Sequence, residues 1–218
     1  IKKKTRKELH VFFLPEDEEA NIKSVGNLKI DKTINQFVAE TDSIEREVIL
    51  YCHTRNNSLH RVIEYEQPRK GIEVKVVDSS RLCVDLLKYN PELQPVNYVE
   101  IENDATVSSA FNSLVIGFGQ VGLDVVRFLY EFGAFVKSGS TKEKVERSEF
   151  SCNVVDKNMP DLAGLFVVNA PAIQPAMPFK ESGCKESLIT LHGMDFQSVY
   201  FYEKLEEWVK NLNYVVVA

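Results

Sequence analysis

The chain has 218 residues, of which 44% are hydrophobic, and this suits one large or two small packed α/β domains. Its formal net charge of −6 argues against nonspecific nucleic-acid binding, because a surface that follows a phosphate backbone needs Lys and Arg in excess. No apolar run approaches the roughly 20 residues that a membrane-spanning helix needs.

The two ends of the chain suggest that it is a piece of a larger protein. Residues 1–8 are predicted to be a basic tether, or alternatively the basic stretch that follows a membrane helix on its cytoplasmic side. The chain begins without Met and ends on a hydrophobic segment, Tyr214 to Ala218. The four cysteines have neither disulfide nor metal spacing, so we expect reduced thiols. We therefore expect a cytoplasmic protein, held at the inner membrane face if the parent protein is membrane-bound.

The region 9–105 alternates short apolar runs with helical patterns. Strands are predicted at 9–14, 48–52, 72–77 and 96–101, and helices at 34–44, 58–67 and 80–89. Strands that alternate with crossover helices predict a parallel sheet, and hence a Rossmann-like α/β unit. The segment Phe13 to Asp17 offers Pro and acids where phosphates would lie, so we expect no dinucleotide in this unit.

A second Rossmann-like unit is predicted over 110–218, with the boundary between Ile101 and Ala110. Strands are expected at 114–116, 150–155, 188–191 and 214–218, and helices at 123–133, 161–166 and 199–212. Polar residues 137–149 are expected to form a surface loop, and residues 169–184, with three prolines, to be irregular and to lie near a domain or subunit contact.

A glycine motif of the form G-x-G-x-x-G follows the first strand of this second unit. A tight turn needs Gly117, close approach to a pyrophosphate needs Gly119, and close packing of helix on strand needs Gly122. The amides of Phe118, Gln120 and Val121 then face the phosphates at a helix start. The spacing predicts that Gly133 ends this helix.

Asp156 ends the next predicted strand, where a carboxylate can accept both hydroxyls of an adenosine ribose. It would favour NAD(H) over NADP(H), because it repels a 2′-phosphate. The usual distance from the glycines is about 20 residues, whereas Asp156 lies 34 beyond Gly122, and the polar loop 137–149 accounts for the excess. The alternative role for Asp156 is a turn residue at the end of a strand.

Four blocks together resemble the TrkA-N domain, the nucleotide-binding part of RCK (KTN) modules. They are residues 114–132, 150–158, 191–195 and 212–218. Residues 48–78 resemble the second half of another such domain. The whole chain also resembles the central region of bacterial multidomain proteins with a ryanodine-receptor-type repeat.

The resemblance implies a regulatory module that binds NAD(H), ADP or ATP, pairs as a homodimer, and gates a potassium channel or transporter domain in the parent protein. It implies a module that is not an enzyme. From the net charge and the cysteine spacing we expect neither a nucleic-acid partner nor a metal. The matching blocks add Lys157 and Gly193 to the expected nucleotide-binding site. The family often has Gly-Asp after the third strand, whereas here Met194 separates Gly193 from Asp195, so the sequence departs from the family pattern where the adenine would lie.

Two other readings of the sequence remain open. The chain could be a fragment of an NAD-dependent oxidoreductase whose catalytic part lies elsewhere, or a structural module whose glycines serve packing alone. Tyr200 and Lys204 match the Y-x-x-x-K spacing of short-chain dehydrogenases, but the glycine spacing does not, so an exposed helix face is the favoured reading. The four histidines are scattered, and His192 is expected in the core or in a turn.

Overall fold

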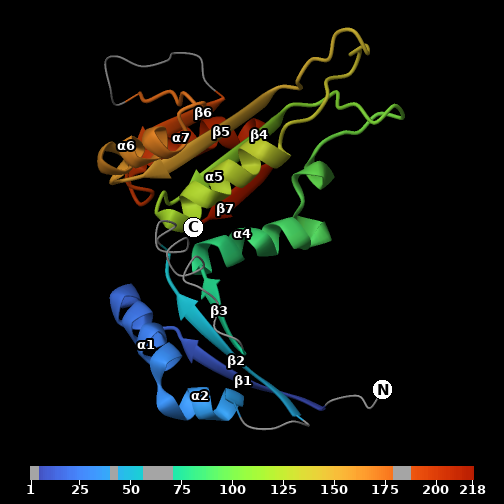
Figure 1. Ribbon diagram of the computed structural model, residues 1–218. Helices are drawn as coiled ribbons and strands as arrows, with labels where there is room; N and C mark the ends of the chain where they lie inside the picture. The colour runs from blue at the N-terminus through green and yellow to red at the C-terminus, as the bar shows by residue number, and fades with distance from the viewer. Residues whose placement is uncertain (1–4, 40–43, 56–70, 179–187) are drawn as a thin grey trace. The chain divides into compact units, whose positions relative to one another are not determined.

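The computed structural model describes residues 5–39, 44–55, 71–178 and 188–218 (Figure 1). The chain divides into two compact units, Ile1–Leu82 and Cys83–Ala218. The division falls inside helix α4 (Ser79–Tyr89), earlier in the chain than the boundary expected between Ile101 and Ala110. Each unit has its own parallel sheet, as the sequence predicts for a Rossmann-like α/β architecture.

The first unit is a three-stranded parallel sheet with helices on one face. Its strands lie in the order β1-β2-β3. Its elements are β1 (Thr5–Phe13), α1 (Glu18–Ile30), α2 (Lys32–Ala39), β2 (Ile44–His53) and β3 (Ile72–Val77). Alternate residues of the strands, with Val25 of α1, form a buried core that α1 and α2 cover.

In the first half, the structure differs from the prediction in three places. Helix α1 is absent from the prediction, because its sequence has little apolar periodicity. Asp17 caps this helix by accepting from the Ala20 amide at 3.0 Å. The helix expected over 34–44 ends at Ala39, and Ile44 opens β2 instead. The predicted strand at 96–101 is wrong: Pro95 opens a short 3-10 helix, η2 (Pro95–Tyr98), where its fixed φ suits a first helical position.

One predicted helix, residues 58–67, lies outside the described residues. In the described part, a short 3-10 helix, η1 (Pro91–Leu93), follows α4. Ile101 forms only an isolated bridge to Val107.

The second unit is a four-stranded parallel sheet in the order β6-β5-β4-β7. Its strands are β4 (Phe111–Ile116), β5 (Phe150–Asp156), β6 (Ile189–Gly193) and β7 (Tyr214–Val217). Its helices are α5 (Gln120–Phe132), α6 (Met159–Asn169), α7 (Val199–Trp208) and the short η3 (Val209–Asn211). All four predicted strands are confirmed. Helix α5 begins three residues earlier than expected and ends before Gly133, whose amide donates to the Leu129 carbonyl at 2.8 Å.

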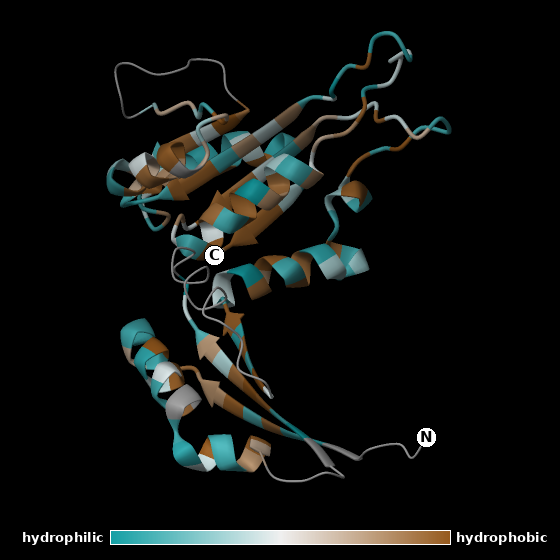
Figure 2. Cartoon of the chain, in the orientation of Figure 1, coloured by the Kyte–Doolittle hydropathy of each residue, from teal (hydrophilic) through white to brown (hydrophobic). Residues whose placement is uncertain are grey.

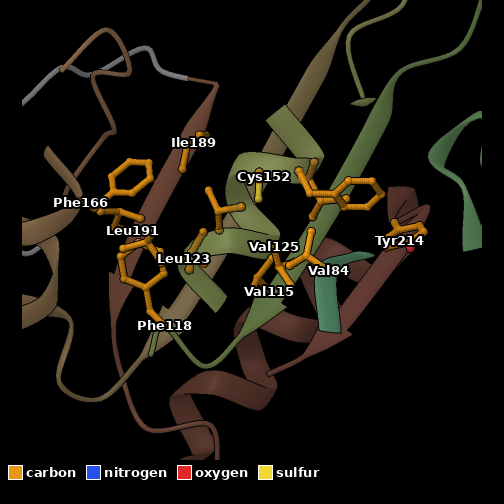
Figure 3. Close-up of a cluster of buried hydrophobic side chains, with 14 of the residues drawn as sticks. Val84, Val115, Phe118, Leu123, Val125, Cys152, Phe166, Ile189, Leu191 and Tyr214 are labelled. Atoms are coloured by element: carbon orange, nitrogen blue, oxygen red, sulfur yellow. The ribbon is translucent and has the colours of Figure 1, made fainter. Parts of the chain in front are cut away.

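Helices cover both faces of this second sheet, so the unit has three layers. Apolar side chains of α5 and α6 meet one face in a large core that includes Phe118, Phe128 and Phe166 (Figure 3). Phe201 and Leu205 of α7 pack on the other face against Leu114 and Val155. The hydrophobic colouring of the strands in Figure 2 agrees with burial on both faces.

Two segments of the second unit are irregular as predicted where they are described, except that Asn169 still belongs to α6. The expected position of residues 169–184 near a domain or subunit contact stays a prediction. Residues 137–149 form an extended loop that is joined to its surroundings by isolated bridges such as Val136 to Arg147. Residues 170–178, which carry the three prolines, contain no regular helix. The remainder of the proline-rich segment, 179–187, lies outside the described residues.

Candidate functional site

The glycine loop lies at the carboxyl edge of the second sheet, where it joins β4 to α5 (Figure 1). From β4 the chain crosses to β5 and then to β6, both on one side of β4. It then returns to the other side of β4 as β7. The strand order therefore reverses between β4 and β7. Open α/β sheets bind ligands at the carboxyl edge beside such a reversal.

The three glycines of the motif have different surroundings. Gly117 has φ of 98°, and a Cβ there would collide with the carbonyl oxygen of Ala218, so both conformation and packing require glycine. A Cβ at Gly122 would collide with the Gly117 carbonyl oxygen, which confirms the expected close packing of helix on strand. Gly119 is exposed, and a Cβ added to it would face open space, with no contact within 4 Å. Gly119 is therefore the position of the loop that a ligand can approach closely.

The start of α5 presents backbone amides without helical acceptors. The Leu123 amide donates to the Gly119 carbonyl at 2.9 Å, as the first turn of a helix requires. The amides of Gln120, Val121 and Gly122 come before this first helical hydrogen bond, so they have no acceptor inside the helix. These amides and the positive end of the helix dipole favour an anion there. The Phe118 side chain is buried against Phe166 and holds the loop on the core.

Asp156 connects the glycine loop to the end of β5. Its Oδ2 accepts from the Phe118 amide at 2.8 Å, and its Oδ1 accepts from the Asn158 amide at 2.7 Å. The Phe118 amide, which was expected to face a phosphate, is therefore engaged within the chain. Each carboxylate oxygen keeps a second lone pair, so Asp156 can still accept from a ligand hydroxyl.

The other two expected site residues flank Asp156. Gly193 ends β6 and is the register partner of Asp156, and Lys157 follows Asp156 with an exposed side chain. The structure thus gathers Gly117, Gly119, Asp156 and Gly193 along one edge of the sheet. The Met194 amide donates to the Asp156 carbonyl at 3.2 Å. Met194, the extra residue before Asp195, therefore stays hydrogen-bonded to the end of β5.

The residues considered for catalysis lie on β6 and α7. Tyr200 is exposed on α7, and Lys204 pairs with Glu207 at 3.0 Å, a contact that raises the pKa of Lys204. His192 lies on the α7 side of the sheet, where its Nε2 is 2.9 Å from Asn153 Oδ1 and its ring packs against Trp208. Burial and then the nearby Lys204 charge lower the pKa of His192 to about 4.

Two open cavities of the second unit lie at the opposite, amino edge of its sheet. One of about 620 Å³ is lined by polar groups that include Asn112, Glu149 and Asn213. Another of about 490 Å³ is lined by Asn112, Arg147 and Ser148. The glycine loop lines neither of these two cavities, and the space beside Gly119 is open. Among the residues that the structure describes, no group of acidic, His and Cys side chains could hold a metal ion.

The fold and this loop define an α/β protein with a Rossmann-like parallel sheet and a glycine-rich turn at its strand-order reversal. No protein-family model, no curated protein and no solved structure matches the chain. No helix within the described ranges has the length and apolar character to cross a membrane.

Proposed function

We propose that the second unit binds an adenine nucleotide, with NAD(H) as the first choice and ADP or ATP as alternatives. The observation that carries this proposal is the coincidence of three features at one sheet edge. They are the open Gly119, the amides at the start of α5, and the Asp156 carboxylate. The amides suit a pyrophosphate, and the carboxylate suits ribose hydroxyls.

The proposed role of binding is regulatory. A nucleotide that contacts both the α5 start and the end of β5 stabilises one arrangement of these elements, and it shifts a conformational equilibrium by its differential affinity. The resemblance to RCK modules supports a homodimer that controls a potassium channel, a transporter or another linked domain. In this proposal the nucleotide is bound and released unchanged.

The rival function, a fragment of an NAD-dependent oxidoreductase, predicts turnover. The exposed position of Tyr200 and the pairing of Lys204 with Glu207 give no support to a Tyr–Lys acid catalyst. Mixing the protein with NADH and a panel of carbonyl compounds separates the two functions: steady oxidation of NADH would favour the oxidoreductase.

The decisive experiment compares Gly119→Val with Gly164→Val by calorimetric titration of NADH, ADP and ATP. Both glycines have open space around a Cβ, so neither substitution is expected to disturb packing. Only Gly119 lies at the proposed phosphate site. Gly119→Val should weaken binding by at least ~2 kcal/mol, about 30-fold, because a branched side chain occupies the phosphate position. Gly164→Val, an exposed helix position, should bind as the wild type does.

Equal affinity of Gly119→Val and wild type would place the binding site elsewhere. No binding of any of the three nucleotides by the folded wild type would instead favour the structural reading of the loop.

A further inference from the structure

A second polar cluster lies at the carboxyl edge of the first sheet and is independent of the glycine loop. It is built by the segments that follow the three strands: the Pro15 carbonyl after β1, His53 and Arg55 at the end of β2, and Ser79 after β3. All four residues belong to the first unit. In open parallel α/β sheets, ligands bind outside the carboxyl ends of the strands.

The hydrogen bonds of His53 fix which ring nitrogen carries the proton. Its Nδ1 lies 3.3 Å from the Pro15 carbonyl oxygen, which can only accept, so Nδ1 is the donor. In the neutral ring Nε2 then holds a lone pair, and it lies 3.2 Å from Ser79 Oγ. The Ser79 hydroxyl therefore donates to Nε2, the arrangement in which a histidine acts as a general base toward a serine.

Arg55 adds a positive charge at the same oxygen. Its Nε donates to Ser79 Oγ at 3.3 Å. The Ser79 hydroxyl thus donates to His53 while its oxygen accepts from a guanidinium, and the Arg55 charge would stabilise negative charge on Oγ. Asp78 caps α4 by accepting from the Ser80 amide at 3.0 Å, which holds Ser79 at the start of the helix.

The members of this cluster differ in how far they are exposed. The His53 side chain is buried with 7% exposure, Ser79 is half-buried, and Arg55 is exposed. Asn21 Nδ2 donates to both the Pro15 and His53 carbonyls, at 2.8 and 3.0 Å, and so ties the β1 and β2 ends together.

Glu18 supplies a fixed negative charge beside this cluster. Burial alone would raise its pKa, but the Thr54 hydroxyl at 2.6 Å, the Arg55 amide and the nearby His53 and Arg55 side chains together lower it. The lowered pKa keeps Glu18 ionised beside the positive charge of Arg55.

We propose that Ser79 is a catalytic nucleophile toward carboxylic esters, with His53 as its general base. Ser79 Oγ attacks the carbonyl carbon and its proton passes to His53 Nε2. The bond to the alcohol oxygen then breaks, and His53 returns the proton to that oxygen. Water hydrolyses the acyl-serine by the same route, so one ester and one water give one acid and one alcohol. This activity is separate from the proposed nucleotide binding.

The test treats the whole chain with a fluorophosphonate probe, which phosphonylates activated serines, and with 4-nitrophenyl acetate as a model ester. We expect one adduct per chain on Ser79, located by peptide mass spectrometry, and its loss in Ser79→Ala. His53→Gln should slow labelling and ester hydrolysis by at least ~100-fold, since a general base contributes about 10²–10⁴-fold. Arg55→Gln, an exposed position, should slow both to a smaller extent.

Ser198→Ala is the matched control. Ser198 is another half-buried serine at a helix start, where its Oγ accepts from the Phe201 amide and donates to the Asp195 carbonyl, with no histidine partner among the described residues. This variant should label as the wild type does. Labelling of Ser79 in the folded wild type at no more than the rate of Ser198, or of the urea-unfolded chain, would overturn the proposal, whether or not the Ser79 and His53 variants fold.

Discussion

The carboxylate of Asp156 joins two segments of the second unit, the glycine loop and the start of α6. We predict that Asp156→Ala lowers stability by about 1–3 kcal/mol, because two amides lose a charged acceptor. It should also weaken NADH binding and reduce discrimination against NADPH. Urea unfolding and calorimetry measure the two effects, with Asp161→Ala, an exposed acid of α6, as the control.

The stability effect and the binding effect of Asp156 are separable. Destabilisation alone, with unchanged NADH affinity and no gain in tolerance of NADPH, would leave Asp156 as a turn residue and refute its assignment to the ribose.

His192 makes stability depend on pH. Its pKa is lowered from the ordinary value of 6.5 to about 4 in the folded chain, chiefly by burial. As the pH falls from about 6.5 toward 4, the unfolded chain takes up the proton first, so stability is full above this window and declines within it. Allowing for partial solvent access, we expect a loss of about 1–2 kcal/mol.

The measurement is urea unfolding of wild type and His192→Gln at pH 7 and pH 4.5. The variant should lose less stability on acidification than the wild type. His10→Gln, which replaces an exposed histidine, should follow the wild type. An identical decline in His192→Gln would mean that other groups cause the acid sensitivity.

At the scale of elements, the contact between β4 and α5 depends on Gly122. We predict that Gly122→Ala destabilises the protein by at least ~2 kcal/mol, because its Cβ would collide with the Gly117 carbonyl and only backbone movement relieves the contact. Gly164→Ala in α6 should have the opposite sign, a gain of about 0.5–1 kcal/mol, since the site is open and helical.

Thermal and urea unfolding of both alanine variants test this comparison. A Gly122→Ala protein as stable as Gly164→Ala would show that α5 does not need close approach to the glycine turn.

At the scale of the whole molecule, β7 is an edge strand. Within the described part of the chain it pairs as a strand with β4 alone, and its Val215 and Val217 side chains are exposed. Hydrophobic edges of this kind favour pairing with another chain. We predict a homodimer by sedimentation at micromolar concentration, and a shift toward monomer in Val217→Lys. A strictly monomeric wild type would contradict the prediction.

Patterns among near neighbours in the sequence were sufficient to predict much of the secondary structure of the second unit. The apolar strands, the glycine motif and the acid after β5 each depend on near neighbours, and the structure confirms the strand–turn–helix that they predict. The same reasoning failed for α1, whose sequence has little apolar periodicity, and for residues 96–101, where Pro95 favours a short helix over the strand that the apolar residues suggest.

Only the tertiary structure decided which distant residues meet. The bond from the Phe118 amide to Asp156 spans 38 residues, and the contact of His53 with Ser79 spans 26, so neither forms a motif along the chain. Both pairs arise because parallel strands bring their carboxyl ends to one edge, whatever the length of the connections between them. The sequence by itself determined the residue types and the turn that could serve a site, and the strand order determined that these side chains lie together.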